Sequence, residues 1–384
     1  MDLTKIIKKI EIIYFNLSKL CNDSLMQLFK RINNRYFYLI IFFTISILVS
    51  ALVLVIERKI LGFGPLYHPD SEHYMNFQSK YYYLSLKYSV AENFKNYLYN
   101  FSNGSLYYSI THLFYELKQI VNFSTPYRNL IKLNILFYAL TNLLILNCLI
   151  KQFHREKKID YKTLIIILFF CFLPYKLHLS VHVLKETLIF FFLSIYILYP
   201  NKFTFIISFI FGTPLRLSFG FYYLAFIDFN KSFLKKYYLI LCLTIIGVVI
   251  WFYKNVYHFY GFSDILVFLE NRNLSNMGGR DFNLVPNFSE YGYYGFILRV
   301  ITWPILFLTG GFIFFSKTIY LYVIGFEIII LQLLYYYEKK KFILSLGLIL
   351  FLCLVAMYVN SYTAYIRYCY LAINIYFLKI ILNK

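Results

Sequence analysis

Charged residues are scarce in this sequence. Asp, Glu, Lys and Arg make up 15% of the 384 residues, whereas soluble domains carry about 25%. Hydrophobic residues reach 60%, and the mean hydropathy is +0.61. Several apolar runs have the roughly 20 residues that are needed to cross about 30 Å of hydrocarbon. The composition therefore argues against a soluble globular protein and predicts an all-α polytopic integral membrane protein.

Acidic residues are particularly few: 18 Asp and Glu stand against 38 Lys and Arg, which gives a net charge of +20. In a soluble protein this excess would suggest binding to nucleic acid. In a membrane protein, cytoplasmic loops rich in Lys and Arg have the same composition. We therefore expect a lipid bilayer as the partner, and no nucleic acid.

Cysteine is also sparse, because the six residues are scattered and form no CxxC or Cys/His spacing. We therefore expect no metal site, no disulfide framework and no cofactor. No cleavable signal peptide is expected either, since the first apolar run begins near Tyr36 and is long enough to remain as a span. The sequence has no internal repeat, so it gives no support to an inverted-repeat transporter.

The positive-inside rule predicts how the chain crosses the membrane. Residues 1–35 form a basic cytoplasmic segment, and residues 36–384 form a single transmembrane domain. We expect about ten transmembrane helices, both termini in the cytoplasm, and two extracytoplasmic loops at about 57–130 and 254–297. The segment 296–315 is expected to be interfacial or re-entrant, because a full span there would place the later Lys cluster outside.

The expected apolar segments can be given individually. Two short ones meet on the outer side at Pro214, since Gly and Pro interrupt helices there. The expected spans lie at about 36–56, 131–150, 163–175, 186–200, 237–253, 317–337, 342–359 and 368–383.

This topology places many charged residues at or near the outer face. A charge at the centre of a membrane helix costs roughly 2.5–3.5 kcal/mol, so such residues are usually paired or functional. One polar cavity that opens outward would explain them together. The residues are Asp70, Glu72, Lys185, Glu186, Arg216, Arg272, Arg280 and Arg367.

Each candidate also has a structural interpretation. At a span end, Glu186 suits the helix dipole and Lys185 reaches the interface; the alternative is that Lys185, with His178 or His182, contacts an anionic group. Asp70 fits an ordinary loop turn, or it acts as a carboxylate beside an acceptor hydroxyl.

Three arginines invite the same comparison. Arg216 follows a proline inside an apolar segment, and its planar guanidinium suits phosphate or carboxylate. Arg280 follows two glycines in an outer loop that is either flexible or close to a ligand. Arg367 lies at the outer start of the last expected span, near the hydrogen-bonding side chain of Asn360.

The order of these elements resembles bacterial polytopic glycosyltransferases of the C superfamily and the surface-polysaccharide repeat-unit polymerases. The matching pieces are "HPDSEHY" in the first outer loop, Pro174 followed by Lys185-Glu186, Leu215-Arg216, and the closing "NSYTAYIRY". The sequence departs from the pattern at Glu186, where many relatives carry Asp, and at Leu217-Ser218, where an aromatic residue or Pro is usual.

The resemblance implies a glycosyltransferase C-like fold in the bacterial cytoplasmic (inner) membrane. It also implies an undecaprenyl-linked oligosaccharide as substrate, with a chain-length regulator as a further partner. Asp70 would be the catalytic carboxylate, and Glu186, Glu72 and Asn360 would have supporting roles. The pyrophosphate would be bound by Lys185, Arg216, Arg280, Arg367 and His182.

Our leading functional expectation is a membrane glycosyltransferase that polymerises undecaprenyl-pyrophosphate-linked repeat units into O-antigen or capsular polysaccharide at the periplasmic face. One enzymatic alternative and one transport alternative remain open at this point. One is a C-superfamily transferase that adds a single sugar from undecaprenyl phosphate. The other is a flippase or transporter of lipid-linked oligosaccharides, which would require a cationic cavity accessible from both sides. A structural membrane protein is a third alternative.

Overall fold

The computed structural model describes somewhat more than half of the chain. Within that part the protein is all-helical, and no strand occurs. The described residues are 35–64, 67–68, 106–111, 113–114, 126–156, 161–226, 292–316, 318–339, 346–359 and 362–382.

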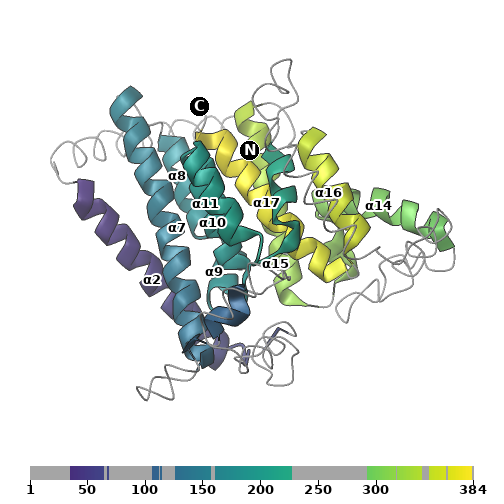
Figure 1. The fold of residues 1–384 in the computed structure, drawn as a ribbon, viewed down its shortest axis with the longest axis horizontal. Coiled ribbons are helices and arrows are strands. Elements are labelled where there is room, and N and C mark those ends of the chain that lie inside the picture. Colours follow the sequence, from purple (N-terminus) through teal and green to yellow (C-terminus); the bar gives the residue numbers. More distant parts are fainter. Residues whose placement is uncertain are drawn as a thin grey trace, which may run out of the picture.

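From α7 to η1, and again from α14 to α17, the helices follow one another with short connections (Figure 1). Two of them, η1 and η3, are 3₁₀ helices. In chain order the elements are α2 (Arg35–Lys59), α7 (Pro126–Glu156), α8 (Tyr161–Cys171), α9 (Pro174–Ser180), α10 (Glu186–Leu198), α11 (Lys202–Gly212), η1 (Leu217–Phe226), α14 (Gly292–Leu308), η3 (Gly311–Phe315), α15 (Ile319–Lys339), α16 (Leu346–Tyr358) and α17 (Tyr362–Leu382).

Three described helices are long and apolar enough to cross a membrane: Phe37–Lys59, Tyr127–Lys151 and Ile319–Tyr336. Each overlaps almost all of one span expected from the sequence, at 36–56, 131–150 and 317–337 respectively. Along α2 the large apolar side chains of Ile40, Leu48 and others remain exposed, as expected of a lipid-facing surface. The chain is therefore a membrane protein, whereas the count of ten spans is not confirmed.

Several expected boundaries agree with the structure. The helix α10 begins where the span expected at 186–200 begins and ends two residues earlier, and α11 ends just before Pro214. The segment 296–315 consists of α14, which contains Pro304, and the 3₁₀ helix η3. The expected span 237–253 and the outer loop 254–297, except for its last six residues, lie outside the described part, as do residues 1–34.

The last helix begins earlier than expected. α17 starts at Tyr362, six residues before the expected span, so Arg367 lies in its second turn. Hydropathy alone placed the start at Tyr368 because Arg367 and Thr363 lower the local average. The structure buries Tyr362 and Tyr365 completely, and this packing extends the helix.

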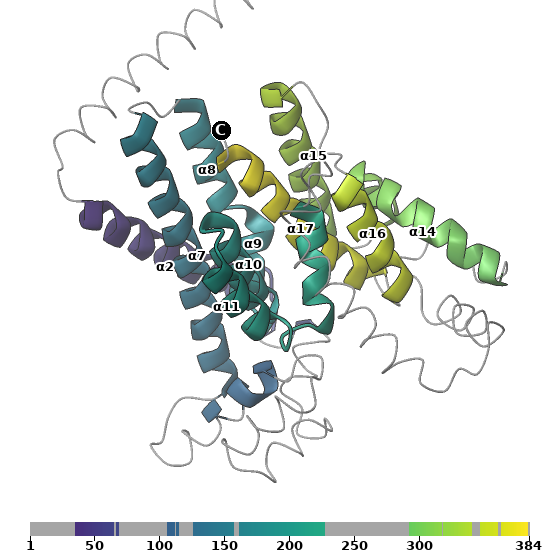
Figure 2. The ribbon, with the colours of Figure 1, turned by 45° about the horizontal axis from the view of Figure 1, so that its top comes forward.

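α17 occupies the centre of the bundle (Figures 1 and 2). It contacts α10, α14, α15, α16 and η1. All of its side chains from Cys369 to Leu378 are buried. A helix that is buried on every side must be surrounded by other elements, which agrees with this position. On one side of it, α10 packs against α7, and α7 packs against α2.

Local sequence explains the short helices. Pro174 occupies the first turn of α9, where its missing N–H costs nothing, and Leu173 before it is extended. The Asn201 side chain accepts from the Thr204 N–H while the Thr204 hydroxyl accepts from the Asn201 N–H, which forms a capping box at the start of α11.

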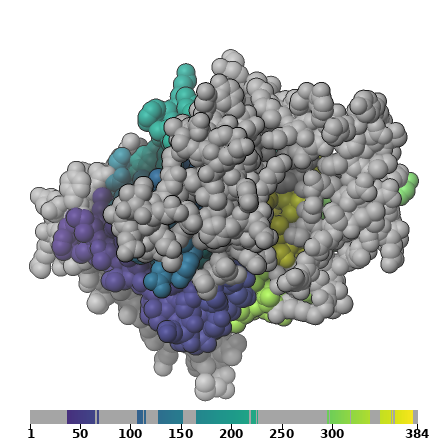
Figure 3. All heavy atoms as spheres, turned by 60° about the horizontal axis from the view of Figure 1, so that its bottom comes forward, coloured from purple at the N-terminus to yellow at the C-terminus, as the bar shows by residue number. Residues whose placement is uncertain are grey.

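The end of α2, the start of α7 and α9 lie toward the bottom of Figure 1, whereas the C-terminus lies at the top. In Figure 3, which brings that bottom face forward, α2 (purple) and part of the C-terminal region (yellow) are both visible.

Candidate functional site

The connection between α9 and α10 contains two of the polar residues of the candidate site. It comprises residues 181–185, with His182 near its start and Lys185 at the N-cap of α10. Asn134 on α7 holds it, because its side-chain amide donates to the carbonyls of His182 (2.7 Å) and Leu184 (2.8 Å). A buried amide that satisfies two carbonyls fixes the path of this connection.

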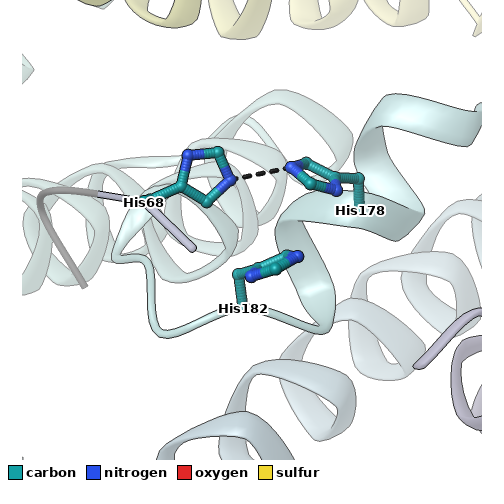
Figure 4. Close-up of side chains that lie close together, drawn as sticks. All are labelled: His68, His178 and His182. Carbon is teal, nitrogen blue, oxygen red and sulfur yellow. Dashed lines mark hydrogen bonds between the residues drawn. The ribbon is translucent and has the colours of Figure 1, made fainter. Parts of the chain in front are cut away.

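Three histidines converge at this connection and form what we call the histidine cluster: His68, His178 and His182 (Figure 4). His178 lies on α9, His182 lies four residues later, and His68 comes from the segment after α2. The imidazole centroids of His178 and His182 are 4.4 Å apart, and that of His68 is 4.9 Å from each. The Nε2 atoms of His68 and His178 are 2.7 Å apart.

Glu57, in the last turn of α2, joins two of these rings. Its Oε1 is 2.9 Å from His178 Nδ1, and its Oε2 is 2.6 Å from His182 Nε2. A carboxylate only accepts hydrogen bonds, so both of these nitrogens carry protons. In the neutral rings the other nitrogens, His178 Nε2 and His182 Nδ1, are then unprotonated. His68 Nε2–H accordingly donates to His178 Nε2.

The turn after α2 brings His68 back toward Glu57. The backbone N–H of Phe63 donates to the Glu57 carbonyl (2.8 Å), and Gly62 adopts a φ of 70°, which favours glycine. Arg58 stabilises the turn, since its guanidinium donates hydrogen bonds to the carbonyls of Phe63 (2.6 Å) and Val181 (3.5 Å). These contacts tie the end of α2 to the connection between α9 and α10.

The cluster is withdrawn from solvent: the exposed fractions are 4% for His68, 5% for His178 and 0% for His182. Burial, the neighbouring imidazoles and the charges of Arg367 and Arg58 hold the pKa of His68 well below its usual range. Burial is also the largest influence on His182 and lowers its pKa to about 4. Both rings are therefore neutral at pH 7, and the contact of His182 with Glu57 is a hydrogen bond and not an ion pair.

Aromatic rings enclose the histidines. Tyr320 stacks on His178 at 5.9 Å, and Tyr175 stacks on it at 5.6 Å. Tyr67 lies 5.2 Å from His68 and 5.9 Å from His182. This wall lowers the local dielectric and strengthens any electrostatic interaction inside it.

A second group, the Glu186–Arg216 cluster, begins where the same connection enters α10. Glu186 Oε1 accepts from Arg216 Nη2 at 2.9 Å, and both side chains are at most 2% exposed. Arg216 Nη1 donates to the Tyr222 hydroxyl at 2.8 Å. The Arg216 guanidinium lies 3.4 Å from the centroid of the Tyr368 ring, in cation–π contact.

The second turn of α17 connects the two clusters. Tyr368 contacts Arg216, and the charge of its neighbour Arg367 acts on His68. The connection 181–185 also links the two clusters, because it contains His182 of the first cluster and leads directly to Glu186 of the second. Adjacent residues of the chain thus link the two clusters at two places, and we refer to both clusters together as the polar centre, whose residues come from four regions of the sequence.

The structure brings together five of the candidate residues: His182, Lys185, Glu186, Arg216 and Arg367 all belong to this centre or adjoin it. Lys185 is buried, with 5% exposed. Four others, Asp70, Glu72, Arg280 and Asn360, lie outside the described residues, as does Arg272.

Some important residues were not found from the sequence. Glu57 lies one residue beyond the span expected at 36–56, and His68 is the first residue of the "HPDSEHY" motif, in which only the acidic residues were considered. Glu327 on α15 is a third: its carboxylate accepts from the Tyr175 backbone N–H (2.7 Å) and from the Tyr370 hydroxyl, which fixes the start of α9. An acidic residue within an apolar run was the one available signal for Glu327.

Comparison with known proteins adds no relative. No family model matches this chain, and neither a curated protein nor a solved structure matches it.

Proposed function

We propose that this membrane protein is a glycosyltransferase that polymerises undecaprenyl-pyrophosphate-linked repeat units into O-antigen or capsular polysaccharide at the outer face of the bacterial inner membrane. One observation carries the proposal. Glu186, Arg216 and Tyr368 belong to three separate pieces of the ordered pattern that resembles the polymerases, and the buried Arg216 contacts both of the others.

The chemistry of the transfer suits this centre. When the glycan leaves its carrier, negative charge develops on the pyrophosphate, and preorganised cations stabilise that charge. Glu186 partly neutralises Arg216 and fixes its guanidinium, so we assign to Arg216 a positioning role. Arg367, beside Tyr368, and Lys185, beside Glu186, are the cations that would face the pyrophosphate.

The acceptor side of the reaction needs a group that takes a proton from a sugar hydroxyl. We retain Asp70 for this role. It lies outside the described residues, two positions after His68 in the sequence. A single-sugar transferase would use the same two kinds of group, and the products of the reaction distinguish it from a polymerase.

The proposal is tested with Arg367→Gln in the bacterium that encodes the protein. The substitution removes the charge but preserves most of the length of the side chain. We expect the ladder of lipid-linked and surface glycan to collapse toward a single repeat unit, with a normal amount of the variant in the membrane. Arg128→Gln is the matched control, because Arg128 is an exposed arginine near the start of α7.

Two results would count against the proposal. A normal ladder in Arg367→Gln would remove this arginine from the site. A ladder of normal length whose every repeat lacks one sugar would instead identify the single-sugar transferase.

A further inference from the structure

The histidine cluster brings three possible metal ligands close together. One ring nitrogen from each of His68, His178 and His182 lies within 4.8 Å of the other two. A tetrahedral zinc ion with Zn–N bonds of about 2.0–2.1 Å separates its ligand nitrogens by about 3.4 Å. Side-chain movements on the order of 1 Å would therefore convert the cluster into a coordination shell.

Glu57 provides the support that such a shell requires. A metal-bound histidine usually donates its other N–H to a carboxylate or carbonyl, which fixes the ring and its tautomer. Glu57 accepts from His178 Nδ1 and from His182 Nε2 at the same time. One carboxylate thereby orients two imidazoles and leaves each with an unprotonated nitrogen.

One of these nitrogens has no partner in the described part of the chain. His182 Nδ1 is buried and makes no hydrogen bond there, and the whole residue is 0% exposed. A buried acceptor without a partner costs about 1–3 kcal/mol. The hydrogen bond between His68 and His178 does not satisfy this nitrogen, whereas a bound metal ion would use the lone pair of His182 Nδ1.

We propose that His68, His178 and His182 bind one divalent transition-metal ion of the zinc class, with Glu57 holding two of the ligands in place. Neutral imidazoles favour Zn²⁺, Co²⁺, Ni²⁺ and Cu²⁺ over Mg²⁺ and Ca²⁺, which prefer oxygen. Three protein ligands also leave a fourth position for water or for a ligand atom, as in catalytic zinc sites. The site does not depend on the proposed glycosyl transfer.

Two of the surrounding charges would repel a bound cation, and one would attract it. Arg58 and Arg367 both act on His68 and would repel a dication. The Glu57 carboxylate offsets part of that repulsion. An anionic oxygen at the fourth position would offset more of it, so we expect the ion to bind most tightly together with an anion.

The test uses the full chain, purified in detergent without a polyhistidine tag and stripped with a chelator. Titration with Co²⁺ should give one equivalent of bound metal and the visible absorption of a four-coordinate ion, which Zn²⁺ should abolish. His178→Ala and His182→Ala should each weaken binding by more than about 100-fold, beyond the 10–100-fold effect usual for an outer partner.

His154→Ala is the control. His154 lies on α7, 20 positions beyond Asn134, or about 30 Å along the helix at 1.5 Å per residue. This variant should bind Co²⁺ like the wild type. Folding of every variant is checked by size-exclusion chromatography.

The wild-type titration alone decides the proposal if the alanine variants do not fold. A wild-type protein that takes up no Co²⁺ or Zn²⁺ stoichiometrically would overturn it. Equal binding by the wild type and a folded variant that lacks both His178 and His182 would overturn it as well.

Discussion

Removing one member of the Glu186–Arg216 ion pair should destabilise the protein much more than replacing both. The Oε1–Nη2 distance is 2.9 Å, and the two side chains are 1% and 2% exposed. A substitution of one partner leaves the other charge buried without compensation, which costs about 3–5 kcal/mol. Replacement of both by uncharged residues of similar volume is often neutral.

The variants are Glu186→Gln, Arg216→Met and the double substitution. Each single change should lower the free energy of unfolding by about 3–5 kcal/mol. The double variant should lose about 2 kcal/mol or less, including about 1 kcal/mol for the hydrogen bond from Arg216 to the Tyr222 hydroxyl. The coupling free energy between the two positions is then at least about 4 kcal/mol.

The assay is reversible unfolding of the purified protein in mixed detergent micelles, followed by fluorescence. Arg128→Met is the control, because Arg128 is exposed and its loss should change the free energy of unfolding by less than about 0.5 kcal/mol. Strictly additive effects of the two single substitutions would show that the charges do not interact, and the reasoning about this buried pair would fail.

Three further predictions concern the supports of the site. Asn134→Leu should cost about 1–3 kcal/mol of folding stability, measured by the same unfolding assay, because the carbonyls of His182 and Leu184 lose their donor. Gly212→Ala should also destabilise the protein, by about 1–3 kcal/mol, since a Cβ there would lie 2.1 Å from the Phe219 ring, whereas Gly220→Ala meets only an ordinary contact at 3.7 Å and should not. Glu57→Gln should weaken Co²⁺ binding 10–100-fold in the titration described above, and an unchanged affinity would remove Glu57 from the metal centre.

The sequence predicted those features that depend on neighbouring residues. Long apolar runs gave the positions of α2, α7 and α15, and the Gly212–Pro214 interruption gave the end of α11. The start of α17 was predicted too late, because burial of Tyr362 and Tyr365 against other helices outweighs the polarity of that turn. Such packing is not visible in a local hydropathy average.

The candidate site was predicted in part for a similar reason. Charged residues within apolar surroundings stand out, so Glu186, Arg216 and Arg367 were named as candidates, and the structure shows that Arg216 pairs with Glu186 and contacts the ring of Tyr368. Their pairing could not be read from the sequence, since 30 residues separate Glu186 from Arg216. His178 and His182 were named as candidates, but their meeting with His68 was missed because 110 residues separate His68 from His178 and the sequence has no short metal-binding spacing.

The most direct test of the proposed function is reconstitution of the reaction. A strain that lacks the gene should accumulate its undecaprenyl-pyrophosphate-linked repeat unit, and this material, extracted from its membranes, serves as the substrate for the purified protein. We predict that a ladder of longer glycans forms while undecaprenyl pyrophosphate is released. If the deletion strain instead accumulates a repeat unit that lacks one sugar, or if the purified protein joins no repeat units, the protein is not a polymerase.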